Sequence, residues 1–248
     1  MTAALPRRLL AEFLGTGLLV TAVVGSGIAA ARLSPRDAGL QLLENALATM
    51  LALAVLILIF GRVSGAHLNP VVSAVDWWLH RRDERGLSSR ELAGYVTAQT
   101  LGGIGGTVLA HAMYGLAPVS WSATSRSGPG VWLGEVVATA GLVLLVFTLV
   151  RTGRTAAAPA AVGAYIGAAY WFTSSTSFAN PAVTVGRAFT DTFAGIAPGS
   201  VPGFLGAQLV GAAVGVMLVV TLYPAPAPRP AGATSPGDHP SNPKTVLS

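Results

Sequence analysis

The sequence contains no cysteine, and only 10% of its 248 residues are charged. Without cysteine, the chain has no disulfide framework, no thiolate metal site and no cysteine nucleophile. Soluble domains carry about 25% charged residues, so this chain has too little charge to cover a water-facing surface of its length. Disorder of the bulk is excluded too, because disordered chains combine low hydrophobicity with high charge.

Apolar sequence takes the place of charge: 52% of the residues are hydrophobic, and the mean hydropathy is +0.61. A helix that crosses a bilayer needs roughly 20 predominantly apolar residues. Six runs approach or reach this length, at about residues 9–33, 40–60, 92–114, 131–150, 156–172 and 201–222. The first run is too long for a cleaved signal peptide, so we expect it to be retained.

Arginine and lysine are distributed unequally between the two ends of these runs. With the N-terminus in the cytoplasm, eleven of them lie on the cytoplasmic side and four on the other, namely Arg32, Arg36, Arg126 and Arg187. The positive-inside rule therefore predicts that both termini are cytoplasmic and that the number of spans is even. We expect a multi-pass protein of a bacterial-type inner (plasma) membrane, with the lipid bilayer and not nucleic acid as its partner.

The chain contains an internal repeat. Glu12 near the start of the first span matches Glu135 in the fourth, and Gln99 in the third matches Gln208 in the sixth. We place repeat one at about 8–115 and repeat two at about 130–223, within a channel domain of residues 1–223. Three spans in each repeat give the two halves opposite orientations in the membrane, as in many transporters and channels. Residues 224–248, rich in Pro, Ala and Ser, are predicted to form a disordered cytoplasmic tail.

Two shorter apolar segments, at 66–79 and 179–193, each contain an Asn-Pro pair after a span. Asn is a strong helix N-cap and Pro fits the first helical position, so we predict half-helices over 70–78 and 181–192. In inverted halves they would enter from opposite faces and meet near the midplane. Irregular backbone at that depth is tolerated only if it is buried in protein or lines a cavity. Their N-termini would repel cations, including hydronium, while Asn69 and Asn180 bind uncharged solutes.

The loops at 64–70 (Ser-Gly-Ala-His-Leu-Asn-Pro) and 177–182 (Ser-Phe-Ala-Asn-Pro-Ala) resemble the two signature loops of the aquaporin and aquaglyceroporin family, the major intrinsic proteins. The resemblance extends over about residues 8–223. It implies an all-α membrane protein with six transmembrane helices, two re-entrant half-helices and an inverted repeat. It also implies a homotetramer with one pore per subunit. We expect no catalytic residue, cofactor or metal, since His80 and His111 have no partner at metal-ligand spacing. The implied pore signature is Asn69, Pro70, Val71, Asn180, Pro181 and Ala182, in which Val71 replaces the family's alanine.

The resemblance also places a selectivity filter. Its four positions are Thr49, Ala168, Ser177 and Val183. The family usually has an arginine where this chain has Val183, together with aromatic side chains at other positions. We therefore expect a wide constriction lined by two hydroxyls and two apolar groups, which would admit uncharged solutes larger than water.

The sequence around Val183 narrows the resemblance further. Residues 180–191 are similar to those of a bacterial, arsenic-associated subgroup in which valine replaces the filter arginine. That resemblance implies passage of arsenite- and antimonite-type metalloid hydroxides or of methylated arsenicals, in addition to water and glycerol-like polyols.

Four further side chains have more than one interpretation. Arg187 lies one helical turn beyond Val183, where it would act as a displaced filter cation, lie in the outer vestibule or anchor its loop through carbonyl groups. His67 either narrows the cytoplasmic half of the pore or is a packed neutral histidine. Glu12 and Glu135 are ionisable groups in apolar spans, where a proton relay is one reading. We expect instead that they are structural acceptors for the amides of the two signature loops.

Three functions remain open. The leading one is a passive channel for small uncharged solutes. A secondary transporter is the main alternative, because transporters also have inverted repeats and broken helices, although its carboxylates would have to be Glu12, Glu135 or Glu44. A nonconducting membrane scaffold is the other alternative. An enzyme is not expected, because the sequence has no phosphate-binding loop, dinucleotide fingerprint or nucleophile elbow.

Overall fold

The computed structural model describes residues 3–81 and 86–224. The expected tail therefore lies outside the described residues, apart from Pro224. The described residues form eight α-helices and no strand, which confirms the all-α fold class. The helices are α1 (Leu5–Leu33), α2 (Ala38–Ser64), α3 (Pro70–His80), α4 (Ser89–Met113), α5 (Pro129–Arg151), α6 (Ala158–Phe172), α7 (Pro181–Arg187) and α8 (Val201–Leu222).

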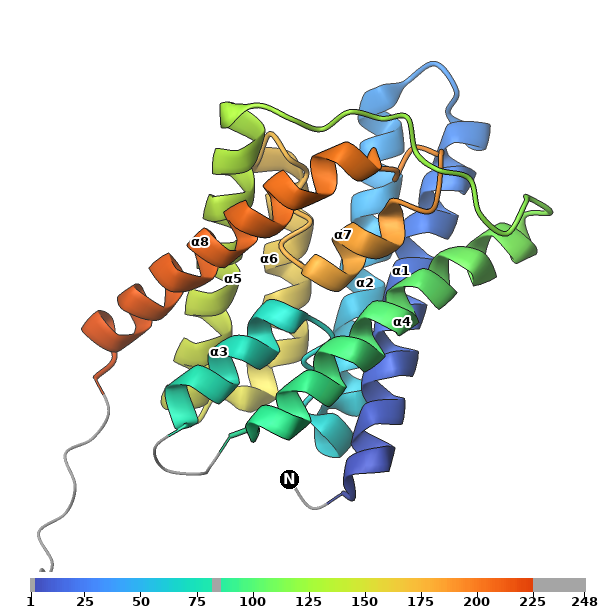
Figure 1. Ribbon diagram of the computed structural model, residues 1–248. Helices are drawn as coiled ribbons and strands as arrows, with labels where there is room; N and C mark the ends of the chain where they lie inside the picture. Colours follow the sequence, from blue (N-terminus) through green and yellow to red (C-terminus); the bar gives the residue numbers. More distant parts are fainter. Residues whose placement is uncertain (1–2, 82–85, 225–248) are drawn as a thin grey trace, which may run out of the picture.

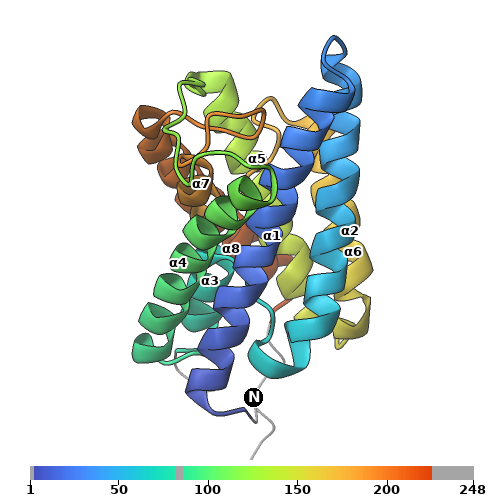
Figure 2. The same cartoon turned by 90° about the vertical axis from the view of Figure 1, so that its right-hand side faces the viewer.

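Four of the helices are long and apolar enough to cross a membrane by themselves: α1, α2, α5 and α8 with the turn before it. Two further helices complete the six expected spans. α4 packs along α1, and α6, preceded by a 3-10 turn at Thr155–Ala157, packs along α2 (Figure 2). α4 is less apolar because the body of the helix contains several glycines and threonines together with Gln99 and His111.

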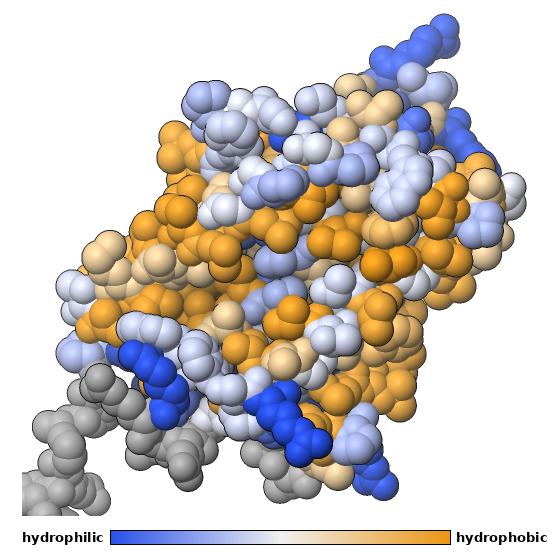
Figure 3. Space-filling view, viewed as in Figure 1, coloured by the Kyte–Doolittle hydropathy of each residue, from blue (hydrophilic) through white to orange (hydrophobic). Residues whose placement is uncertain are grey.

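The outside of the bundle is suited to lipid. Hydrophobic residues cover the middle of the face in Figure 3, and hydrophilic residues gather toward its two ends. Large apolar side chains exposed on single helices include Leu51 and Leu58 of α2 and Leu209 and Met217 of α8. A water-soluble protein rarely exposes so continuous an apolar surface, so this pattern fits a protein that is embedded in a bilayer.

The two halves of the chain have the same arrangement of helices in opposite orientations. α1 packs on α4 as α5 packs on α8, and the short helices α3 and α7 occupy equivalent places in the centre (Figure 1). α3 extends from the centre toward the end of the molecule that holds the N-terminus, whereas α7 is connected to loops at the other end. The described chain begins and ends on the same side, as an even number of spans requires.

Glycines allow the closest helix contacts in both halves. A Cβ at Gly106 of α4 would lie 2.1 Å from the carbonyl oxygen of Gly17 in α1. In the second half, a Cβ at Gly211 of α8 would lie 2.6 Å from the carbonyl oxygen of Val136 in α5. Helices in membranes associate through such small-residue contacts, because lipid offers no hydrophobic driving force between them.

The half-helices begin where the two asparagines predict. Asn69 is the N-cap of α3, and its Oδ1 accepts from the Val71 amide at 2.9 Å. Asn180 is the N-cap of α7, and its Oδ1 accepts from the Ala182 amide at 3.0 Å. A proline follows each cap, where the missing N–H costs no hydrogen bond.

The second half-helix is shorter than expected. It ends at Arg187, five residues before the predicted boundary at 192. The amide of Phe189 bonds to the Gly186 carbonyl in a tightened last turn, and the Ile196 amide returns to the Arg187 carbonyl. The segment after α7 therefore folds back on the end of the helix, a long-range contact that the local sequence does not reveal.

Candidate functional site, a cavity at the tips of two half-helices

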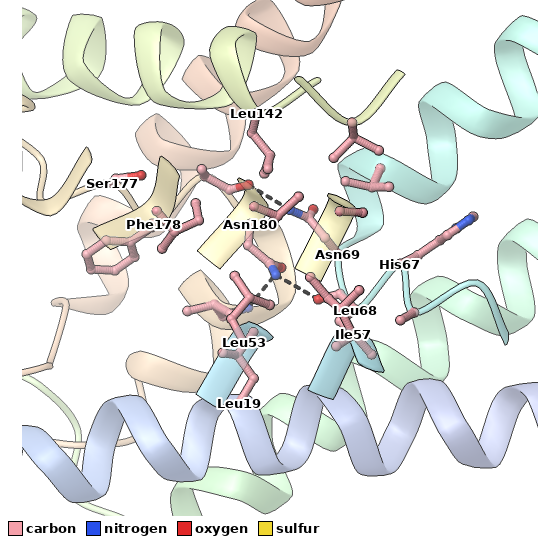
Figure 4. Close-up of a pocket in the computed structure, with 18 of the residues that line it drawn as sticks. Leu19, Leu53, Ile57, His67, Leu68, Asn69, Leu142, Ser177, Phe178 and Asn180 are labelled. Carbon is pink, nitrogen blue, oxygen red and sulfur yellow. Dashed lines mark hydrogen bonds between the residues drawn. The ribbon is translucent and has the colours of Figure 1, made fainter. Parts of the chain in front are cut away.

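The two half-helix tips are joined by reciprocal hydrogen bonds at the centre of the molecule. Asn69 Nδ2 donates to the Ala179 carbonyl at 2.8 Å, and Asn180 Nδ2 donates to the Leu68 carbonyl at 2.7 Å. Figure 4 shows the asparagines side by side, with His67 on one side of them and Ser177 and Phe178 on the other. Each amide nitrogen carries two N–H groups, so each keeps a second donor beyond the bond that joins the loops.

The loops that lead to the two caps have the same unusual backbone. Ala66 and Leu68 have φ of 48° and 49°, and the matching residues Ser177 and Ala179 have φ of 48° and 47°. Non-glycine residues in the left-handed region cost about 1–3 kcal/mol each, and they persist only where their surroundings hold them. Other groups in the protein must therefore hold the two loops in this conformation.

Glu12 holds the first loop. Its Oε1 accepts from the His67 amide at 3.0 Å and from the Ser64 hydroxyl at 2.6 Å. Its Oε2 accepts from the Leu68 amide at 2.7 Å and from Gln99 Nε2 at 2.7 Å. The carboxylate is fully buried, and these four donors compensate for its removal from water.

Glu135 makes the equivalent set in the second half. Its Oε1 accepts from the Phe178 amide at 2.8 Å and from the Ser175 hydroxyl at 2.7 Å. Its Oε2 accepts from the Ala179 amide at 2.9 Å and from Gln208 Nε2 at 2.7 Å. The two repeats found in the sequence therefore also make equivalent individual hydrogen bonds.

A cavity of about 160 Å³ passes the two tips. It is lined by α1, α2, α3, α5, α6, α7 and both loops, and none of its lining residues comes from α4 or α8. Asp76 of α3 lines it on one side of the asparagines, and Ser177 and Arg187 line it on the other. Most of the wall is aliphatic, and the polar groups are concentrated at the loops and half-helices.

Three of the four expected filter residues lie in this wall: Thr49, Ser177 and Val183. The expectation is wrong for Ala168, which is exposed on the outside of α6 and does not line the cavity. Tyr170 lines the cavity instead, and its hydroxyl donates to Thr49 Oγ1 at 3.3 Å.

Helical periodicity explains why Tyr170 and not Ala168 lines the cavity. The buried face of α6 contains Val162, Ile166 and Tyr170 at intervals of four residues, and all three line the cavity. Ala168 is two residues away from this stripe, a spacing that turns its side chain to the opposite face of the helix. The sequence shows that these three residues share one face of α6, but only the packing of the helix shows that this face is turned to the cavity.

Arg187 is 2% exposed and lines the cavity. Its Nε donates to the Ala194 carbonyl, and its guanidinium lies 3.5 Å from the centroid of the Phe178 ring. Arg187 therefore both anchors the loop after α7 and lines the cavity, so these two interpretations are compatible. A second cation, Arg126 in the loop before α5, faces the same ring at 5.3 Å, and burial lowers its pKa from the ordinary value.

His67 lines the cavity on the other side of the asparagines and is half-buried. Its Nδ1 lies 3.1 Å from the Ser73 hydroxyl, and its ring meets Tyr95 edge-on at 5.4 Å between centroids. These contacts fix the ring at the wall of the cavity.

The arrangement can be compared with known proteins. The profile of the family described as Major intrinsic protein matches residues 1–179, which is most of the chain. The aquaglyceroporin AqpS of Rhizobium meliloti (strain 1021) is 53% identical over 215 residues, which cover 87% of this chain and 89% of that protein. This chain belongs to the major intrinsic protein family. Members of this family are passive membrane channels and not enzymes, as the sequence predicts.

More distant major intrinsic proteins extend the comparison. The probable aquaporin AqpM of Archaeoglobus fulgidus is 28% identical over 248 residues, covering 90% of this chain and 98% of that protein. The X-ray structure of the aquaglyceroporin from Plasmodium falciparum superposes with a TM-score of 0.66, covering 87% of this chain and 96% of that one at 24% identity. The latter likeness concerns the fold alone, and it supports the six-helix architecture with two half-helices.

Proposed function

We propose that this major intrinsic protein is a wide, aquaglyceroporin-type channel that conducts water, glycerol-like polyols and neutral metalloid hydroxides of the arsenite and antimonite type or methylated arsenicals. The observation that carries the proposal is the cavity between Asn69 and Asn180 with Val183 in its wall. A valine in place of the arginine that is usual in the family leaves room for solutes larger than water. The printed name of the relative at 53% identity, an aquaglyceroporin, supports the same solute class.

The chemistry of the wall favours uncharged, oxygen-bearing solutes. The N-termini of α3 and α7 meet at the cavity, and their partial positive charges oppose the passage of cations. The asparagine amides, the Ser177 hydroxyl and loop carbonyls provide donors and acceptors for hydroxyl groups. Arsenous acid is uncharged at pH 7 and carries three hydroxyls, so it resembles a small polyol in this respect.

A coupled secondary transporter is less well supported. Such a transporter needs a carboxylate that can exchange a proton or an ion with the solute pathway. Glu12 and Glu135 each accept four hydrogen bonds from the protein, and neither lines the cavity. We infer that both are structural supports of the loops.

The membrane topology and assembly are part of the proposal. Both described chain ends lie on one side of the molecule, and the bias of arginine and lysine assigns that side to the cytoplasm (Figure 1). We propose a location in the inner (plasma) membrane and a homotetramer with one cavity per subunit. The many exposed apolar side chains of α2 and α8 are available for lipid and for neighbouring subunits.

Purified protein in liposomes tests the proposal. Stopped-flow light scattering with water, glycerol, urea, arsenite and methylarsenicals should show fluxes that rise linearly with solute concentration and do not follow a proton gradient. Empty liposomes give the background. Saturable flux driven by a proton gradient would support the transporter, and no flux of any solute above background would support a nonconducting scaffold.

A further inference from the structure

Arg187 has a hydrogen-bonding capacity that the protein does not use. Its side chain is buried, yet its Nη1 has no hydrogen-bond partner. Among the described residues, Arg187 also makes no ion pair with a carboxylate. A buried, unsatisfied charged donor is costly, so its presence in the wall of a cavity calls for a partner inside the cavity.

A second polar atom without a partner belongs to Ser177, which lines the same cavity from the neighbouring loop. This atom is the side-chain hydroxyl, and it is buried. A hydroxyl is both a donor and an acceptor, whereas a guanidinium only donates. A solute that carries several hydroxyl groups can satisfy both side chains, because its oxygens accept from Arg187 and one of its hydroxyls can donate to Ser177.

Arg187 is held against the wall. The central carbon of its guanidinium lies over the Phe178 ring, 3.5 Å from the centroid, and Phe178 is in turn packed edge-on against Phe204 at 4.9 Å between centroids. Its Nε also donates to the Ala194 carbonyl. These two contacts hold the cation at the wall and leave Nη1 unpaired.

We propose that Arg187 provides the cation of the outer constriction in place of the residue at position 183, and that with the Ser177 hydroxyl it forms a binding subsite for the oxygens of uncharged polyols and hydroxides. The proposal rests on the proposed channel function. It separates two properties of the constriction. Val183 determines its width, and Arg187, one turn farther along α7, determines its charge. The channel then admits larger neutral solutes and still rejects cations.

The surrounding charges are compatible with this role. The electrostatic neighbours of the guanidinium are Tyr170, Arg126 and Glu135, and the Tyr170 side chain also forms a hydrogen bond with it. The unpaired donor is therefore Nη1 alone. The Glu135 oxygens are already occupied by four donors, so they do not satisfy the free Nη1 of Arg187. Arg126 adds a second positive charge on the same side of the cavity, and Tyr170 is neutral near pH 7.

The test compares Arg187→Gln with Arg126→Gln in liposomes. Arg126 is the matched control, because it faces the same Phe178 ring and bonds to the same segment, with Nε donating to the Gly195 carbonyl at 2.8 Å, but it does not line the cavity. We expect Arg187→Gln to raise the proton and sodium leak by about ten-fold or more, since it removes a full charge from a confined pathway. Arg126→Gln should leave the leak within about two-fold of the wild type, because the charge it removes is outside the wall.

Two further variants distinguish a role of Arg187 in permeation from a purely structural role. Arg187→Lys keeps the charge but loses the planar face, so it should retain cation exclusion and lower glycerol permeability, because a flexible ammonium can reach across the cavity. Ser177→Ala should lower glycerol and arsenite permeability more than water permeability. If Arg187→Gln does not fold, Arg187→Lys tests the proposal instead. Permeabilities of Arg187→Lys that equal those of the wild type for all solutes would contradict the proposal.

The failures of the two proposals are distinguishable. No neutral flux through the wild-type protein would overturn the channel function itself. A wild-type protein that conducts glycerol, with equal cation leaks in Arg187→Gln and Arg126→Gln, would overturn the role of Arg187 alone.

Discussion

The side-chain amide of Gln99 donates to Glu12 at 2.7 Å, and the same amide nitrogen donates to the Ser73 hydroxyl at 2.9 Å. Gln99 belongs to α4, Glu12 to α1 and Ser73 to α3, so this one amide links the loop support to the half-helix itself. In the second half Gln208 makes the matching bonds to Glu135 at 2.7 Å and Thr184 at 2.9 Å. The positions of the half-helices are thus determined by polar groups buried among apolar helices, where each bond is strong and each loss is costly.

Glu12→Gln tests this support. The substitution replaces an acceptor oxygen by an NH₂ group facing N–H donors, which leaves buried donors unsatisfied at about 1–3 kcal/mol each. We expect the unfolding temperature in detergent to fall by several degrees. Glu44→Gln is the control, because Glu44 accepts a single bond, from the Ser34 hydroxyl at 2.8 Å. A Glu12→Gln protein of normal stability whose flux had become independent of pH would argue for a proton relay instead.

Gly106→Ala tests the contact between α1 and α4. The added Cβ would lie 2.1 Å from the Gly17 carbonyl oxygen, so the helices would have to separate, at a cost of about 1–3 kcal/mol. We expect a lower unfolding temperature and a lower yield of folded protein. At Gly105 the nearest atom, Phe13 Cζ, is 3.9 Å away, and Gly105→Ala should be neutral or slightly stabilising. Equal effects of the two substitutions would contradict the close contact.

Val183→Arg tests the width of the constriction. Val183 is buried in the wall of the cavity, so a long cationic side chain there would narrow the passage and add a charge. We expect stopped-flow permeability to glycerol and arsenite to fall more than permeability to water. Val183→Leu adds bulk without charge, which separates the two effects. If all fluxes fell by the same factor, the assignment of Val183 to the constriction would be wrong.

Tyr170→Leu and Ala168→Leu test which residue of α6 faces the pathway. Tyr170 lines the cavity and bonds to Thr49, so a smaller side chain there should raise the ratio of glycerol to water permeability. Ala168 is on the exposed face, and Ala168→Leu should leave the ratio unchanged. If Ala168→Leu changed the ratio in swelling assays and Tyr170→Leu did not, Ala168 and not Tyr170 would belong to the constriction.

Much of the fold follows from short-range patterns. The predicted spans at 131–150 and 201–222 agree with α5 (Pro129–Arg151) and α8 (Val201–Leu222) to within two residues. Both asparagine caps were also predicted correctly, since a cap and the proline after it depend on neighbouring residues only. The errors concern features that long-range contacts determine. The length of α7 depends on the segment that folds back on its end, and the residue of α6 that lines the cavity depends on how that helix is rotated against its neighbours.

The sequence by itself determined the class of protein, the number of spans, their inverted repetition and the two half-helices that begin at Asn69 and Asn180. It could do so because hydropathy, capping and charge bias are properties of neighbouring residues along the chain. Only the tertiary structure decided that Glu12 and Glu135 each accept four hydrogen bonds, that Tyr170 and not Ala168 lines the cavity, and that Arg187 lies over the Phe178 ring with its Nη1 unpaired. These relationships join residues that are distant along the chain, and their geometry depends on helix rotation and loop return, which no local pattern encodes.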